Sequence, residues 1–359
     1  MASDRVIVIA EAGVNHNGSP EMALRLVDAA AETGADLVKF QTFKAEALVT
    51  MSAPKADYQN RNAPESKSQF EMLKALELDR AAHEALIARC KEKGIGFLST
   101  PFDPDSVDLL TRTLGLKLVK VSSGDLTNAP LLLQLARSGA DLIVSTGMAT
   151  LDEVEDALGV LAFGYTEQGE PGADAFKRAF ANPAARAILA QKITLLHCTS
   201  DYPAKLDDIN LRAMDTLAER FGIPTGYSDH SVGIAVSIAA AARGARVIEK
   251  HFTLDRALPG PDHKASIETP EFKQMVDAIR AVSRSLGEAA KAPTNAELST
   301  RKVARKAIVA ARPISSGEAF SLENLTVKRA GEGLAPIRLW EVVGRKASRA
   351  YAADEAIEA

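Results

Sequence analysis

The segment LVKVSSGD, at residues 118–125, is a short apolar run that ends in small polar residues, and it sets the pattern that decides the fold. Runs of the same form recur at 6–10, 37–41, 96–100, 142–146, 193–198, 225–228 and 247–251. Apolar segments with helical spacing separate these runs, as in repeated strand–helix units. Eight such strands in series predict an α/β fold, a closed (β/α)8 TIM barrel.

The pattern changes after residue 286. The stretch GEAAKAPTNAELSTRK is polar, and the short runs that follow it are interrupted by glycines and prolines. We therefore expect a TIM-barrel catalytic domain over 1–285, a linker over 286–302 and a small, mostly β domain over 303–359. Because so small a unit has a limited core, it should pack on its own barrel or on a partner subunit. We expect the segment 163–190 to form an extra helix on the periphery of the barrel.

The composition excludes several classes of partner. The chain has 43 Lys and Arg against 47 Asp and Glu, a net charge of -4, so it has no basic excess for nucleic acid or an anionic membrane. No apolar stretch approaches the roughly 20 residues of a membrane span, and the first residues do not resemble a signal peptide. The two cysteines, Cys90 and Cys198, are too few for a disulfide framework. We therefore expect a cytoplasmic protein.

Polar residues stand at the carboxyl ends of the expected strands, which is where the active sites of TIM barrels lie. Taken singly, each could be a buried ion-pair partner or a helix cap, but chance would not place the whole set at one end. The set comprises Glu11, Lys39, Gln41, Ser99, Thr100, Lys120, Ser122, Ser123, Asp125, Ser145, the HCTSDYP segment at 197–203, Ser228, Asp229, His230, Glu249 and His251.

Part of this set is suited to an anion. Lys39 and Lys120 offer two positive charges, and the hydroxyls and backbone amides near Ser123 and Ser145 offer hydrogen-bond donors. Together they would form a pocket for phosphate or carboxylate.

Another part is suited to a metal ion. His230 and His251, on adjacent strands, could bind one divalent cation and leave coordination positions open, although either could instead hydrogen-bond a carboxylate. Glu249 points to the same side as His251, and Glu11 is a further carboxylate, so a base or an orienting group is available. We expect His83, which has charged neighbours in a helical segment, to lie at the surface.

Longer strings surround these positions and are specific rather than generic. In the barrel they are IAEAGVNHNGS, VKFQTFKAEALVT, APKADYQ, FLSTPFD, KVSSGD, STGMAT, LHCTSDYPA, GYSDHS and IEKHFTLDRALPGPDHKAS. After the linker come VARKAIVA and SGEAFSLENLTVKRAGEGLAP. Over nearly the full chain, these strings resemble the sialic acid synthase family, which comprises the N-acetylneuraminate and legionaminate synthases, with its antifreeze-like (SAF) domain.

The resemblance implies a metal-dependent condensation of phosphoenolpyruvate with an N-acetylated hexosamine, with release of phosphate and with Mn²⁺ or Mg²⁺ as the cofactor. We expect an N-acetylneuraminate synthase that uses N-acetylmannosamine and water. The alternative is a legionaminate synthase that uses 2,4-diacetamido-2,4,6-trideoxymannose. Two further classes stay open, another phosphoenolpyruvate- or phosphosugar-dependent barrel aldolase and a non-catalytic sugar-binding protein.

The resemblance also implies roles for single residues. It implies that Glu11 and Glu249 are catalytic and that His230 and His251 are the metal ligands. For phosphoenolpyruvate binding it implies Lys39, Thr100, Lys120, Ser123, Ser145 and Ser228. For sugar binding it implies Gln41, Tyr202, Asp262 and Arg329.

The small domain has its own implied role. In the family it reaches over the barrel mouth of the other subunit, so the resemblance implies a homodimer in which Arg329 contacts the N-acetyl group of the sugar. The chain departs from the family's pattern at Ala307, where Ser is common, and at Ala330 and Glu332, where Pro and Asn are common. These departures leave the chemistry intact but weaken any assignment of the sugar.

Overall fold

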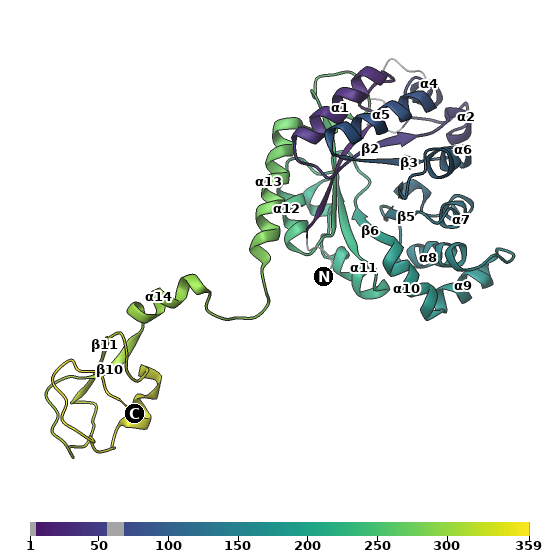
Figure 1. Cartoon of the computed structure of the whole chain (residues 1–359). Coiled ribbons are helices and arrows are strands. Elements are labelled where there is room, and N and C mark those ends of the chain that lie inside the picture. The colour runs from purple at the N-terminus through teal and green to yellow at the C-terminus, as the bar shows by residue number, and fades with distance from the viewer. Residues whose placement is uncertain (1–4, 56–67, 359) are drawn as a thin grey trace. The chain divides into compact units, whose positions relative to one another are not determined.

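The computed structural model describes residues 5–55 and 68–358 (Figure 1). The chain divides into two compact units, Met1–Gly287 and Glu288–Ala359. One string quoted above, APKADYQ at residues 53–59, lies partly outside the described residues. Within the described ranges, no helix is both long enough and apolar enough to cross a membrane.

The first unit is a barrel of parallel strands (Figure 1). Ladders join β1 to β2 and to β8, β2 to β3, and each neighbouring pair from β4 to β8, while β3 lies beside β4. A short strand, β9 (Ile267–Glu268), extends the sheet from β8. The predicted TIM barrel is therefore confirmed. Its strands are β1 (Ile7–Gly13), β2 (Leu37–Thr42), β3 (Gly96–Pro101), β4 (Leu118–Val121), β5 (Asp141–Ser145), β6 (Ile193–Cys198), β7 (Thr225–Asp229) and β8 (Val247–Thr253).

Helices cover the outside of the barrel (Figure 1). They are α1 (Pro20–Glu32), α5 (Arg80–Lys93), α6 (Pro104–Asp108), α7 (Ala129–Arg137), α8 (Leu151–Thr166), α11 (Ala213–Phe221), α12 (Ala235–Ala242) and α13 (Thr269–Leu286). Two short helices, α2 (Ala45–Leu48) and α4 (Gln69–Lys74), lie instead at the carboxyl ends of the strands. The segment expected to add one helix instead adds two, α9 (Ala173–Ala181) and α10 (Pro183–Lys192). Asn182 separates them because its side chain caps α10 by accepting from the backbone of Ala184, and Pro183 suits the first turn of a helix.

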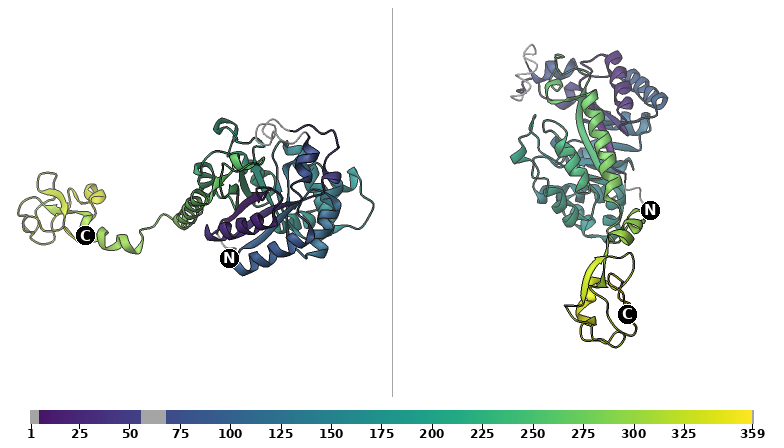
Figure 2. Two further views of the ribbon diagram at one scale, coloured as in Figure 1. Left: turned by 90° about the horizontal axis from the view of Figure 1, so that it is seen from above. Right: turned by 90° about the vertical axis from the view of Figure 1, so that its left-hand side faces the viewer.

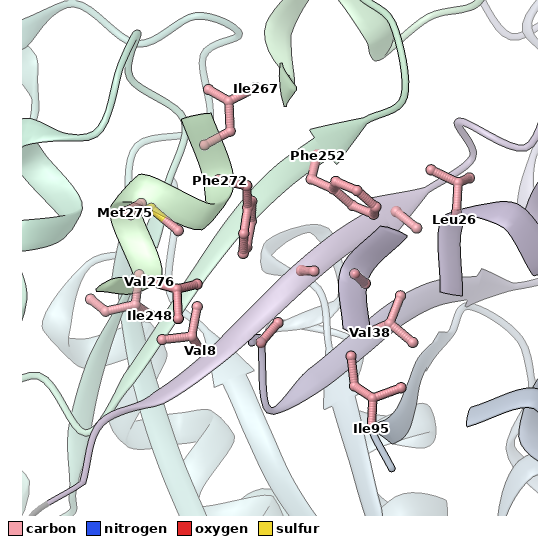
Figure 3. Close-up of a cluster of buried hydrophobic side chains, with 14 of the residues drawn as sticks. Val8, Leu26, Val38, Ile95, Ile248, Phe252, Ile267, Phe272, Met275 and Val276 are labelled. Atoms are coloured by element: carbon pink, nitrogen blue, oxygen red, sulfur yellow. The ribbon is translucent and has the colours of Figure 1, made fainter. Parts of the chain in front are cut away.

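The packing of α13 shows how the outer helices are held. This helix lies beside α12 (Figure 1), and Figure 2 shows it as the long green helix that runs along the barrel. Its residues Phe272, Met275 and Val276 are buried and share one helix face. Figure 3 shows these side chains facing Val8 of β1 and Ile248 of β8, within one apolar cluster. Burial of this kind contributes roughly 25 cal/mol per Å² of apolar surface, so it fixes the wall that carries the strand ends.

The interior of the barrel changes from apolar to polar along its axis. A layer of apolar side chains fills its lower part, comprising Ile9, Leu98, Ile143, Leu196 and Val247. At this level the barrel has no room for a side chain at Gly226, because a Cβ there would lie 2.7 Å from the side chain of Leu196. Side chains two residues apart on a strand point the same way. The next inward positions are therefore Glu11, Thr100, Ser145, Cys198, Ser228 and Glu249, all but Cys198 polar, directly above the apolar layer.

The second unit is a small domain built on an antiparallel pair, β10 (Lys306–Ala310) with β11 (Leu325–Arg329), which confirms the predicted β character. Isolated bridges, such as Ile314 with Tyr351, and the short helix α15 (Leu339–Val342) complete it. Its core comprises Ile308, Ala310, Ile314, Phe320, Leu325, Val342, Ala347, Tyr351 and Ile357. The residues expected to form a linker include most of a helix, α14 (Asn295–Ala304).

Candidate active site

A cavity of about 430 Å³ opens at the carboxyl ends of the barrel strands. It is lined by every residue to which the family resemblance assigns a role except Arg329, namely Glu11, Lys39, Gln41, Thr100, Lys120, Ser123, Ser145, Tyr202, Ser228, His230, Glu249, His251 and Asp262. Three other strand-end residues, Ser99, Asp125 and Asp229, do not line it. Arg329 is exposed at the end of β11 in the second unit. The strand-end pattern therefore identified residues that come together in space.

A larger cavity, of about 700 Å³, lies on the outside of the barrel between α7, α8 and α9. Its lining is mostly apolar, with Glu153, Glu155, Asp156 and Lys177 as its charged residues. It offers neither paired lysines nor a histidine, so the cavity at the strand ends is the better candidate for chemistry.

Two lysines and two carboxylates form a buried network at the base of the cavity. The Lys39 Nζ lies 2.9 Å from Glu11 Oε2 and 3.2 Å from Glu249 Oε2. The Lys120 Nζ lies 3.9 Å from Glu249 Oε1, to which the Ser228 hydroxyl donates at 2.9 Å. The charges of the two lysines and the two carboxylates are therefore matched, which is the condition for burying them.

The two carboxylates differ in acidity. Burial raises the pKa of Glu11 to about 7, because the opposing effect of Lys39 is smaller. Burial also disfavours the charged form of Glu249, but Lys120 and Lys39 outweigh it and hold the pKa of Glu249 at about 2. Glu249 is thus a permanent anion that anchors the lysines, whereas Glu11 can hold or release a proton near neutral pH.

Hydroxyl groups extend the lysine network into an anion pocket. The Lys120 Nζ donates to the Ser145 Oγ at 2.6 Å and to the Val121 carbonyl at 2.9 Å. The Lys39 Nζ also lies 3.5 Å from the Thr100 Oγ1. The Ser123 Oγ accepts from the Gly147 amide at 3.0 Å. Two ammonium groups and three hydroxyls converging on one space suit a phosphate or carboxylate ligand.

The two histidines lie beside this pocket. The His230 Nδ1 donates to the Thr199 carbonyl at 2.6 Å, which leaves its Nε2 as an acceptor. The His251 Nδ1 is buried without a hydrogen-bond partner, and the two imidazole rings are 5.7 Å apart. Burial lowers the pKa of both histidines, so they are neutral, the form that binds metal. Tyr202 packs on His230 with the ring centroids 4.3 Å apart.

These observations fit a divalent cation bound through two imidazole nitrogens. In the part of the chain that the structure describes, no group of three His, Cys, Asp or Glu side chains could hold a metal ion. The protein would therefore supply His230 and His251 and leave the other positions to substrate or water, as an open catalytic site requires.

Besides the lysines and histidines, the cavity is lined by further polar side chains and by apolar ones. Gly13, with φ of +51°, brings the polar ones together, since a Cβ on Gly13 would lie 3.2 Å from Glu11, 3.5 Å from Asp262 and 3.6 Å from Gln41. Burial raises the pKa of Asp262 to about 6. The apolar groups, which sequence reasoning missed, are Leu48, Val49, Leu73, Phe102 and Met148.

Only part of this apolar wall could be found from the sequence. Phe102 follows β3 in the string FLSTPFD, so its place after a strand end was visible. Leu73 lies on α4, far along the chain from the strand ends, and no spacing in the sequence indicates that it reaches the cavity.

The comparisons with known proteins agree with this arrangement. Residues 26–291 match the NeuB family, and residues 305–359 match the SAF domain. The N,N'-diacetyllegionaminic acid synthase of Campylobacter jejuni is 45% identical over 353 residues, 98% of this chain and 99% of that protein. The N,N'-diacetyllegionaminic acid synthase of Legionella pneumophila is 46% identical over 95% of this chain and 90% of that protein.

A solved structure matches as well. The N-acetylneuraminic acid (sialic acid) synthetase of Leptospira borgpetersenii, in complex with citrate, has a TM-score of 0.65 and 33% identity, over 82% of this chain and 90% of that chain. The chain therefore belongs to the NeuB family, as a phosphoenolpyruvate-dependent nonulosonic acid synthase with a C-terminal SAF domain.

Proposed function

We propose that this protein condenses phosphoenolpyruvate with 2,4-diacetamido-2,4,6-trideoxymannose and water to give N,N'-diacetyllegionaminic acid and phosphate. The expectation of an N-acetylneuraminate synthase gives way to its alternative. The observation that carries this choice is the identity of 45% and 46% to two N,N'-diacetyllegionaminic acid synthases, against 33% to the sialic acid synthetase of known structure.

The apolar wall of the cavity supports the same choice. Leu48, Leu73 and Phe102 pack on a cluster that includes Phe43 and Met72, so their positions are fixed. At C6 a 6-deoxy sugar carries a methyl group where N-acetylmannosamine carries a hydroxymethyl group. Burying a methyl group on this wall contributes about 0.8 kcal/mol, whereas burying a hydroxyl without a partner costs roughly 1–3 kcal/mol.

Lys39 and Lys120 would hold the anionic phosphoenolpyruvate. The Ser145 and Thr100 hydroxyls adjoin their ammonium groups, so phosphate oxygens have donors from several strands. As the reaction proceeds, C3 of phosphoenolpyruvate bonds to the aldehyde carbon of the open-chain sugar, whose oxygen takes up a proton. Water adds to C2 and gives up its two protons, one to the former aldehyde oxygen and one to the phosphate. The bond from C2 to the phosphate oxygen breaks, C2 becomes the ketone carbon, and the lysines hold the departing phosphate.

A divalent ion bound by His230 and His251 would act as a Lewis acid on the aldehyde oxygen. Glu11, beside Lys39 and within reach of Gln41 and Asp262, would stabilise positive charge that develops at C2 and orient the water that adds there. Glu249 would hold both lysines in place as the network's constant negative charge.

The test of this reaction is phosphate release from phosphoenolpyruvate. We expect release only when an acetamido sugar is added, and its loss in EDTA with recovery on adding Mn²⁺. A barrel aldolase that works through a lysine Schiff base would keep its activity in EDTA, and borohydride would trap the sugar on the protein. Release without any acceptor, or full activity in EDTA, would count against the proposal.

Arg329 gives a prediction about the small domain. We propose that it contacts an acetamido group of the acceptor from the partner subunit, as the family resemblance implies. Arg329→Ala should raise the KM for the sugar about tenfold, because a hydrogen bond from a charged group is lost, and leave the KM for phosphoenolpyruvate unchanged. The matched control is Arg345→Ala, an exposed arginine of the same domain. An effect on phosphoenolpyruvate alone would contradict the assignment.

Exchange of the small domain between subunits can be tested by mixing two variants. A hybrid of Glu11→Gln and Arg329→Ala subunits has one barrel with Glu11 covered by a domain with Arg329. Co-expressed, differently tagged subunits should therefore recover part of the wild-type rate at low sugar concentration, beyond the sum of the two parents. If each domain served its own barrel, the hybrid would show only the average of the parents.

A further inference from the structure

Two buried charged residues at the strand ends have no part in the chemistry described so far. Asp229 ends β7 and lies between Ser228 and His230, and Lys250 of β8 lies between Glu249 and His251. Both side chains are almost fully buried, and neither lines the cavity. Because side chains alternate along a strand, they point to the outside of the barrel, toward α12 and α13.

Asp229 and Lys250 pair with each other at the end of the ladder. They are direct partners in the β7–β8 register, and the Lys250 Nζ lies 3.0 Å from Asp229 Oδ2. The same carboxylate oxygen accepts from the Ser237 hydroxyl of α12 at 2.6 Å. The pair thus ties the ends of both strands to the helix that covers them.

Ser231, the residue after His230, joins the same network. Its amide and its hydroxyl both donate to Asp229 Oδ1, at 2.9 Å and 2.6 Å, and its carbonyl accepts from Lys250 at 2.8 Å. Three hydrogen bonds therefore fix the backbone that leaves His230. From the other side, the carbonyl of His230 accepts from the Ala204 amide at 2.9 Å.

A buried ion pair is weak evidence for a stabilising role, because apolar side chains of similar volume often stabilise a core as well or better. The contribution of the pair here is to orient the backbone. It fixes the two backbone segments from which His230 and His251 extend, and the positions of metal ligands depend strongly on such outer contacts.

We propose that Asp229, Lys250, Ser231 and Ser237 form a positioning unit that holds His230 and His251 at the separation needed to share one divalent cation. This inference rests on the proposed metal site. The members of the unit are positioning residues, since none of them reaches the cavity.

The test is to titrate Mn²⁺ into the metal-free, full-length protein and to measure binding by calorimetry. The Tm of each variant is measured by thermal unfolding. Lys250→Met and Asp229→Asn should each weaken Mn²⁺ binding at least about tenfold. Ser237→Ala removes one contact without stranding a charge, so it should fold and weaken binding about threefold. The matched control is Arg280→Met, which breaks the ion pair of Arg280 with Asp36, 2.5 Å apart and away from the cavity. It should lower the Tm and leave Mn²⁺ binding unchanged.

A double variant separates positioning from stability. Asp229→Leu with Lys250→Met replaces the pair by apolar side chains and should recover much of the Tm lost in Lys250→Met. Its Mn²⁺ binding should stay weak, because the contacts to Ser231 are absent. Recovery of Mn²⁺ binding together with the Tm would overturn the inference, as would unchanged binding in Ser237→Ala. If the wild type binds no Mn²⁺, or His251→Ala binds it fully, the metal site itself is wrong and the inference fails with it.

Discussion

Replacing Glu11 by Gln should lower turnover about a thousandfold and leave phosphoenolpyruvate binding intact. The amide matches the carboxylate in size, so the cavity keeps its shape. The negative charge that we propose lies beside the reacting carbon is lost, and so is the group that would orient water. Lys39 keeps Glu249 as its partner at 3.2 Å, so the anion pocket is preserved. Steady-state kinetics with calorimetric binding of phosphoenolpyruvate would measure both effects.

The control for this variant is Glu11→Asp, which keeps the charge and shortens the side chain. It should retain clearly more activity than Glu11→Gln, because the carboxylate stays in the cavity. Turnover of Glu11→Gln close to that of the wild type would remove Glu11 from the mechanism.

Replacing His251 by Ala should abolish metal-dependent turnover. Among the described residues that line the cavity, His230 and His251 are the two imidazoles, so removing one would leave the ion a single nitrogen ligand, which is too few to hold a catalytic metal. A Lewis acid contributes several kcal/mol to such a step, and about 4 kcal/mol corresponds to a thousandfold in rate. Activity and Mn²⁺ binding should therefore be lost together.

A second buried histidine provides the comparison. His83 of α5 is fully buried and hydrogen-bonds Thr42 at 2.8 Å, but it does not line the cavity. His83→Ala should lower the Tm without changing Mn²⁺ affinity. If His251→Ala kept full Mn²⁺ affinity, its role as a ligand would be disproved.

The barrel and most of the site could be predicted from two regular features of a parallel barrel. Side chains alternate along each strand, and parallel strands in a closed barrel end at one rim, so Glu11, Lys39 and Glu249 had to converge. The spacing of residues in the sequence could not show which charged side chains form ion pairs with each other. The placement of Lys39 between the two carboxylates, and with it the difference between the pKa values of Glu11 and Glu249, depends on three-dimensional distances.

The expectation for His83 was wrong for a local reason. His83 was expected at the surface because of its charged neighbours, but on a helix it shares its buried face with Leu86 and Cys90. The residues expected to form the linker, 286–302, include most of the helix α14. The Thr294 and Glu297 capping box that begins α14 was legible in the sequence, although the helix buries none of its residues.

The assignment of the sugar depended neither on the alternation of side chains along the strands nor on the rim at which the strands end. The resemblance alone led to N-acetylmannosamine, and the identities to two N,N'-diacetyllegionaminic acid synthases redirect the proposal. The apolar side chains that support the proposed sugar come partly from α4. Its residue Leu73 lines the cavity although it is distant in sequence from the strand ends.

Competition between the two acceptors tests the central claim most directly. The enzyme would receive equal concentrations of 2,4-diacetamido-2,4,6-trideoxymannose and N-acetylmannosamine with limiting phosphoenolpyruvate and Mn²⁺, and mass spectrometry would quantify both products. Because one methyl group in an apolar pocket discriminates by roughly 1–3 kcal/mol, we expect N,N'-diacetyllegionaminic acid to exceed N-acetylneuraminate at least about tenfold. An excess of N-acetylneuraminate would contradict the account.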